Sequence, residues 1–236
     1  MCQCIVQTPA TGGQLGPFSL PGCAIAGEDD DPAATTARQG DTRQRLVKPR
    51  MRLRAILRRD GEPTPLLVRW GWVPHWSMGT RPAVTELSLE QVMRTRLYAR
   101  LRDEGRALIP VEGWYESVRD GAPGARPRLA YVTSRCAGPL FLAAVAQASS
   151  EHNGCDGLAL VTHDPGDGAK RLLALDAIGA QAWLSPDLDW EQASTLATHG
   201  GLGAGQLEQL FWARRSFMAP RRRETPARSA LTTNAT

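Results

Sequence analysis

Apolar and polar residues alternate over several short stretches, which predicts a chain rich in β-strands. From 50 to 58, arginines alternate with apolar residues, as expected for a strand with one face in water. Asp60 and Gly61 form a hairpin signal, and a second strand is predicted at 66–68. Further strand-like runs lie at 2–6, 107–111, 128–133, 139–146 and 157–163.

A helical period replaces this alternation in the stretch 88–104. Its apolar face is made of Leu89, Val92, Met93, Leu97 and Leu101. Ser88 and Gln91 predict a capping box at its start, and Gly105 predicts its end. Two later helices are predicted at 187–197 and 205–212. Many short strands with few helices indicate an α+β fold, in which a mostly antiparallel, partly closed sheet or barrel is surrounded by a few peripheral helices.

The chain of 236 residues is long enough for one large domain or two small ones, and we expect a single domain over 1–213. Residues 7–45 are rich in Gly, Pro, Ala and Thr, contain an acidic run at 28–31 and have no clear period. They are expected to form an irregular insertion. Residues 214–236 contain three consecutive arginines and are expected to form a basic, disordered tail.

Charge limits the classes of protein to which the chain can belong. The net charge is +4, the sequence pI is about 9.0, and nearly all basic residues are arginines. Arginine binds phosphate through two parallel hydrogen bonds, which favours a nucleic-acid partner, although a GC-rich genome also raises arginine content. No apolar run has the length of a membrane span and the N-terminus lacks the pattern of a signal peptide, so we expect no membrane association and a cytoplasmic monomer.

The five cysteines are odd in number and irregularly spaced, which favours free thiols over a disulfide framework. Cys2 and Cys4 form a Cys-x-Cys pair that alternatively hints at metal binding. However, no second pair of cysteines or histidines lies at the spacing of a zinc site. We therefore expect neither a metal nor another cofactor.

Two segments concentrate aromatic residues beside glycine. The first places Trp70, Trp72 and Trp76, three of the seven tryptophans, within seven residues that also contain a glycine and a proline. The second, 108–116, contains Trp114 and ends on the carboxylate of Glu116. Such rings either fill a core or form a wall on which unpaired nucleobases stack, and both interpretations are open.

These two segments and the Met-Cys start resemble the SOS-response-associated peptidase (SRAP) family, as a divergent bacterial or prophage member. The corresponding family signatures are Trp-Gly-Leu-Val-Pro-His-Trp and Leu-Ile-Pro-Ala-Asp-Gly-Phe-Tyr-Glu-Trp, in the same order and at a similar spacing. The resemblance covers 1–6 and about 46–186. It implies a DNA-damage protein that binds single-stranded DNA and traps abasic sites covalently through the cysteine exposed when Met1 is removed.

The resemblance also implies roles for two residues. Cys2 matches the family nucleophile, and Glu116 matches a glutamate that transfers protons and assists removal of Met1. Once Met1 is removed, Cys2 carries an α-amine that titrates at about 8 and a thiol that titrates at about 8.5, so both nucleophiles are partly available. A 1,2-aminothiol of this kind condenses with an aldehyde, such as an open abasic deoxyribose, to an imine and then to a thiazolidine.

Four positions depart from the family pattern. Cys4 stands where the family has an arginine, and the segment 80–86 contains no asparagine to match the family's Asn-Ala-Arg motif, with Arg81 at best a shifted arginine. The family's His-Asp-Arg-Met-Pro motif falls near 175–178, where no histidine occurs. His163 is a candidate substitute acid or base, because imidazole titrates near neutral pH; the alternative is a structural residue that opens a turn.

The residues predicted to bind DNA are Arg69, Trp70, Trp72, Trp76, Arg81 and Trp114. Three functions remain open. The chain is an abasic-site crosslinking enzyme with self-peptidase activity, or a degenerate single-stranded DNA binding module without efficient chemistry, or an amidohydrolase that uses Cys2 as an N-terminal nucleophile on another substrate. Retention of Cys2 and Glu116 favours chemistry over degeneration.

Overall fold

A computed structural model describes residues 2–8, 44–74, 77, 80–118, 126–148, 156–166 and 168–211. Most of the predicted insertion, the whole predicted tail 214–236 and Trp76 lie outside the described residues. Within this part of the chain, no helix has the length and apolar character needed to cross a membrane.

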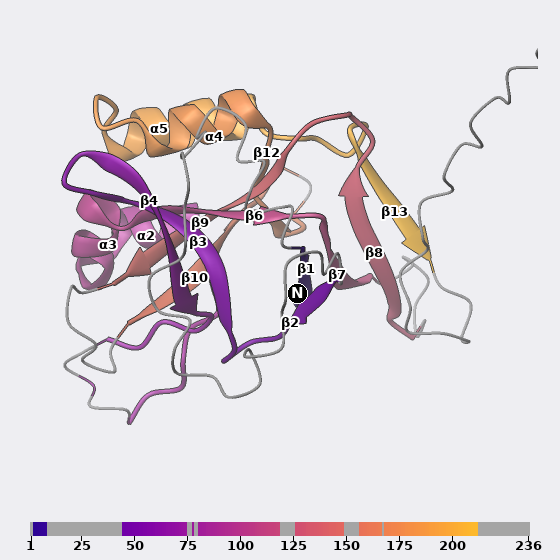
Figure 1. Ribbon diagram of the computed structural model, residues 1–236, viewed down its shortest axis with the longest axis horizontal. Coiled ribbons are helices and arrows are strands. Elements are labelled where there is room, and N and C mark those ends of the chain that lie inside the picture. Colours follow the sequence, from indigo (N-terminus) through magenta and orange to yellow (C-terminus); the bar gives the residue numbers. More distant parts are fainter. Residues whose placement is uncertain are drawn as a thin grey trace, which may run out of the picture.

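Two sheets form the centre of the fold (Figure 1). The first, sheet A, has five strands in the order β13-β8-β7-β1-β2, and every neighbouring pair in it is antiparallel. Its strands are β1 (Cys2–Gln7), β2 (Arg45–Val47), β7 (Gly113–Val118), β8 (Arg128–Ser134) and β13 (Leu207–Phe211).

The second, sheet B, has eight strands, six of them in the order β11-β10-β9-β6-β3-β4. β12 pairs with β9, and β5 pairs with β10 in the one parallel ladder among the described strands. The strands are β3 (Arg52–Arg59), β4 (Glu62–Arg69), β5 (Glu86–Ser88), β6 (Arg106–Val111), β9 (Leu140–Gln147), β10 (Gly157–His163), β11 (Arg171–Leu172) and β12 (Ala174–Leu175).

The mostly antiparallel α+β class is confirmed, but the predicted barrel is wrong, because neither described sheet closes on itself. Side chains, in place of a closing ladder, hold the two sheets together. The buried side chain of Gln7 on β1 donates through Nε2 to the carbonyl oxygens of Arg54 and Pro110, both at 2.9 Å, and accepts from the Arg54 amide at 3.1 Å. The amide of Gln7 thus satisfies backbone groups that a continuous ladder would pair.

The predicted helix at 88–104 is divided in the structure. α2 (Leu89–Arg94) begins with the predicted capping box, in which Ser88 Oγ accepts from the Gln91 amide and the Gln91 side chain accepts from the Ser88 amide. Thr95 then adopts extended backbone angles, and η4 (Arg96–Tyr98) and α3 (Ala99–Glu104) follow. The break allows Tyr98 to pack against Trp72, with ring centroids 5.5 Å apart.

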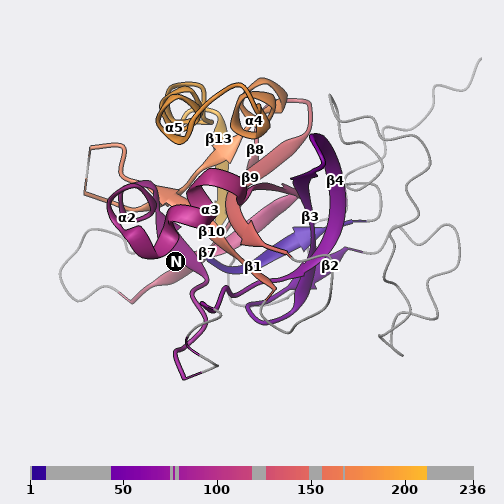
Figure 2. The ribbon, with the colours of Figure 1, turned by 90° about the vertical axis from the view of Figure 1, so that its left-hand side faces the viewer.

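Two further helices lie together against one face of sheet B, as Figures 1 and 2 show from two directions. α5 (Trp190–His199) confirms the helix predicted at 187–197 and starts from a capping box on Asp189. α4 (Ala177–Leu184) escaped prediction because its sequence is apolar on nearly every side and so has no amphipathic period. The helix predicted at 205–212 is wrong: this segment forms β13, which pairs with β8.

The apolar residues form two main clusters, one on each face of sheet B. One cluster lies beneath the helices and includes Trp72, Trp183 and Trp190. The other lies between the two sheets and includes Trp70 and, at its margin, Cys2. Cys2 therefore lies where the inner face of sheet A approaches sheet B.

Candidate functional site

A β-bulge at the start of β1 sets the direction of the Cys2 side chain. Cys2 pairs with Glu116 of β7 and Cys4 pairs with Tyr115, so three residues of β1 oppose two of β7. In a regular strand Cys2 and Cys4 would share a face. Here Cys2 joins Ile5 in the cluster between the sheets, while Cys4 packs with Val6 on the opposite face.

This separation removes the basis for a Cys-x-Cys metal site. The Cys2 Sγ approaches the carbonyl oxygen of Cys4 at 3.8 Å, but the two thiols lie in different apolar clusters. Among the described residues, no group of three or more His, Cys, Asp or Glu side chains is arranged to hold a metal ion.

Glu116 shares a face of sheet A with Cys2, because residues directly opposite each other in an antiparallel pair project to the same side. Its carboxylate accepts from the indole Nε1 of Trp114 at 3.2 Å and from Nε2 of Gln209 at 3.3 Å. These donors come from β7 and β13. Hydrogen bonds from its own strand and from the edge strand thereby hold the Glu116 carboxylate beside the Cys2 thiol.

A second carboxylate, Glu86 of β5, reaches Cys2 from sheet B. Its Oε1 accepts a hydrogen bond from the backbone nitrogen of Cys2 at 2.9 Å. The parallel pairing of β5 with β10 fixes its direction: Leu87 is buried beneath the helices, so Glu86 points to the opposite face, toward sheet A. Sequence reasoning missed this residue, although it is the only carboxylate in 80–86, the segment compared with the Asn-Ala-Arg motif.

The thiol of Cys2 is held in its neutral form. Burial raises the pKa of this thiol well above its ordinary value, and the charges of Glu86, Cys4 and Glu116 raise the pKa further, against a smaller lowering by the N-terminal amine. A proton must therefore leave Sγ when the sulfur forms a bond. The neighbouring carboxylates are the groups placed to receive that proton.

Cys2 and Glu116 line a groove with a volume of about 1210 Å³. His163, at the end of β10, lines the same groove, so the structure brings this predicted substitute into the site. Three basic residues also line it: Arg135, Lys170 and Arg171. A groove that combines a nucleophile, a carboxylate and cationic walls suits an electrophile carried on an anionic chain.

The predicted stacking residues are covered. Trp70 is 0% and Trp72 is 3% exposed, and each indole nitrogen is bonded inside the protein, to the carbonyl oxygen of Thr85 and to the side chain of Gln147 respectively. Both rings therefore belong to the core, and neither presents a face on which a base could stack. Trp114 lines the groove but is 2% exposed.

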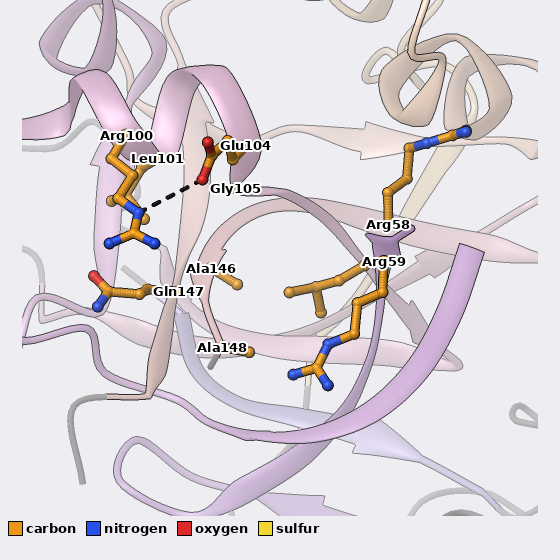
Figure 3. Close-up of a pocket in the computed structure, with 10 residues that line it drawn as sticks. Arg58, Arg59, Arg100, Leu101, Glu104, Gly105, Ala146, Gln147 and Ala148 are labelled. Atoms are coloured by element: carbon orange, nitrogen blue, oxygen red, sulfur yellow. Dashed lines mark ion pairs between the residues drawn. The ribbon is translucent and has the colours of Figure 1, made fainter. Parts of the chain in front are cut away.

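The predicted basic contacts fall elsewhere. Arg69 and Arg81 are exposed, but neither lines the groove around Cys2. A second, smaller pocket of about 80 Å³ lies among the ends of β3 and β9 and the helix α3, and three arginines line it (Figure 3). There Arg100 pairs with Glu104 at 3.5 Å, and Arg58 donates to the carbonyl oxygen of Leu184. None of the predicted site residues lines this pocket.

Comparison with known proteins places this geometry in context. The profile of the SOS response associated peptidase (SRAP) family matches residues 26–203. The abasic site processing protein YedK of Escherichia coli (strain K12) is 27% identical over 146 residues, which cover 59% of this chain and 63% of that protein. The chain thus matches somewhat less than two thirds of the length of this relative.

Solved structures share the fold. A phage-related protein from Bordetella bronchiseptica matches with a TM-score of 0.66 and 22% identity, over 91% of this chain and 95% of that one. A protein from Bacteroides thetaiotaomicron matches with a TM-score of 0.57 and 13% identity, over 72% and 78% of the two chains. Because the family profile covers well over half of the sequence, the chain belongs to the SOS response associated peptidase family.

Proposed function

We propose that this protein binds single-stranded DNA and forms a covalent crosslink to abasic sites through Cys2, after it removes its own Met1. The observation that carries the proposal is the register between β1 and β7, which places the Cys2 thiol and the Glu116 carboxylate side by side on one wall of a groove. Family membership and the similarity to an abasic site processing protein support the same chemistry.

The reaction follows from the two nucleophiles of a free N-terminal cysteine. The α-amine condenses with the aldehyde of an open abasic deoxyribose and releases water. The sulfur then adds to the imine carbon and closes a thiazolidine ring, while its proton passes to a base. Glu116 is the carboxylate on the face of the thiol, and hydrogen bonds from Trp114 and Gln209 keep it oriented.

The proposed DNA partner agrees with the walls of the groove. Arg135, Lys170 and Arg171 supply positive charge that neutralises phosphates. Cys2 is 9% exposed, so the aldehyde must enter the groove to reach the thiol. A nucleotide in a flexible single strand enters such a recess more easily than one held in a duplex.

The test is a denaturing gel of the protein after incubation with a single-stranded oligonucleotide that carries one abasic site. We expect a species that survives denaturation, and intact mass should show loss of Met1 and addition of the oligonucleotide with release of one water. C2A should abolish the species. C136A, which removes an exposed cysteine elsewhere, should leave it unchanged. The absence of the species, while mass confirms a free Cys2, would overturn the proposal.

One observation favours a second candidate, the single-stranded DNA binding module without chemistry. The Cys2 thiol is buried and its pKa is raised, which disfavours the reactive thiolate. This alternative predicts that C2A binds the abasic oligonucleotide as tightly as the unsubstituted chain, and that neither forms a denaturation-resistant species. The same neutral thiol disfavours the amidohydrolase hypothesis, which requires a thiolate to attack an amide.

A further inference from the structure

The backbone nitrogen of Cys2 has its own carboxylate partner, distinct from the one beside the sulfur. Glu86 Oε1 lies 2.9 Å from this nitrogen, across a sequence separation of 84 residues. The distance is within the range of a charge-assisted hydrogen bond. When Met1 is removed, this nitrogen becomes the α-amine, one of the two reacting atoms of the proposed function.

The two carboxylates approach Cys2 from different sheets. Glu116 belongs to sheet A, directly across from Cys2, and both of its oxygens accept from side chains of the same sheet. Glu86 belongs to sheet B, and its contact is with the nitrogen. The charges of both raise the pKa of the Cys2 thiol, which agrees with two separate carboxylates close to one residue.

We infer that Glu86 is the catalytic acid and base for the α-amine of Cys2, while Glu116 serves the sulfur. This inference rests on the proposed function and deepens it by dividing the proton transfers between two residues. Glu86 lies in the segment 80–86, which lacks the asparagine of the family's Asn-Ala-Arg motif, so the carboxylate that contacts Cys2 comes from the segment where the chain departs from the family.

The steps balance as follows. The α-ammonium gives a proton to the Glu86 carboxylate, and the nitrogen lone pair forms a bond to the aldehyde carbon. Glu86 then delivers this proton and a second nitrogen proton, one after the other, to the former carbonyl oxygen, which leaves as water when the C=N bond forms, and the third proton stays on the nitrogen. The thiol proton passes to Glu116 as sulfur attacks the imine carbon, and the C=N electron pair returns to nitrogen. An ammonium, an aldehyde and a thiol become a thiazolidine, a water and one released proton.

The position of Glu86 also affects ring closure. Nitrogen and sulfur must bond to the same carbon, so the nitrogen must stay near the groove while the thiol turns toward the imine. A carboxylate from the facing sheet fixes the nitrogen, and the bulge in β1 fixes the direction of the thiol. Holding both nucleophiles in place reduces the entropy lost in reaching the ring.

The experiment separates the nitrogen step from the sulfur step. The full chain is made with a cleavable leader, and a site-specific protease exposes residue 2 as the first residue, so the result does not depend on self-removal of Met1. In a C2A background only the imine can form, and cyanoborohydride reduces it to a stable secondary amine on the abasic oligonucleotide. We expect E86Q to slow this trapping by about 10²-fold, the usual effect of losing a general acid or base. E86D, which keeps a carboxylate, should restore part of the rate.

A matched control is E90Q, which removes the same charge from an exposed position on α2, where Glu90 pairs with Arg94 at 2.9 Å. It should trap at the rate of the C2A chain. Thermal unfolding of each variant reports whether the fold is kept. Equal trapping rates for E86Q and E90Q would overturn the inference, as would a defect in E86Q that E86D does not relieve.

A small aldehyde distinguishes this inference from the proposed function. Propanal reacts with the same α-amine without any contact to DNA. If the unsubstituted chain forms no crosslink to the abasic oligonucleotide, yet E86Q slows reductive trapping of propanal in the C2A background, the proposed function fails and the role of Glu86 stands. If the crosslink forms and E86Q changes neither reaction, the role of Glu86 fails alone.

Discussion

Replacement of Gln7 by leucine should destabilise the protein strongly, because this side chain joins the two sheets. It is 4% exposed and makes three hydrogen bonds, two to carbonyl oxygens and one from an amide of the facing strands. Leucine has a similar size and satisfies none of these groups. Each buried backbone group left without a partner costs about 1–3 kcal/mol, so with partial relaxation the loss should be about 3–5 kcal/mol. For a domain of this size that corresponds to a fall in Tm of about 6–20 °C.

Circular dichroism during heating measures the effect, and Gln181→Leu on the exposed surface of α4 provides the control. The control should unfold close to the unsubstituted chain. Q7L should also crosslink abasic DNA more slowly, because Gln7 sets the spacing between sheet A, which carries Cys2, and sheet B, which carries Glu86. A Q7L chain that unfolds within about 2 °C of the control would show that water or another side chain satisfies these groups, and would refute the argument.

Three further predictions concern the site. Gly113→Ala should destabilise the β7–β8 pair by about 1–3 kcal/mol, measured by urea unfolding, because a Cβ there would lie 2.4 Å from a carbonyl oxygen of β8. At pH 8 iodoacetamide should alkylate the exposed Cys136 faster than Cys2, as measured by peptide mass analysis. Cys2 should react only as the pH rises above the ordinary thiol range, because burial raises the pKa of its thiol. Equal rates for the two cysteines would contradict the raised pKa of Cys2. The protein should bind single-stranded DNA more tightly than duplex DNA. The double substitution Arg135→Ala and Lys170→Ala should reduce the slope of log affinity against log salt concentration by about 1.4, because each lost phosphate contact contributes about 0.7. An unchanged slope would exclude these two phosphate contacts.

The sequence was sufficient for elements whose pattern is local. The alternation of arginine and apolar residues predicted β3, and the runs at 139–146 and 157–163 predicted β9 and β10. The helix predicted at 205–212 is wrong, and one local spacing there does fit a helical face, because Leu207 and Leu210 are three residues apart. In the structure Leu207 packs against the cluster between the sheets and Leu210 against the opposite face of sheet A, so the strand buries apolar residues on both sides.

The residues of the candidate site were likewise predictable only where a local sequence pattern marks them. Cys2 and Glu116 were predicted through their motifs, and the structure brings them together. Glu86 was missed because its contact depends on the parallel pairing of β5 with β10 and on the approach of one sheet to the other, which no local pattern encodes. The burial of Trp70 likewise follows from packing between sheets, so composition alone left both of its interpretations open.

The bulge at the start of β1 has a consequence for oxidation. Two cysteines separated by one residue would share a face of a regular strand, with their α-carbons about 6.7 Å apart, at the upper limit of the separation that a disulfide spans. The bulge turns Cys2 toward the groove and leaves Cys4 on the other face of the sheet, and a disulfide requires β-carbons about 3.8 Å apart with a defined torsion. Oxidants that damage DNA therefore cannot inactivate Cys2 by joining it to its nearest cysteine in the chain unless the strand first loses the bulge.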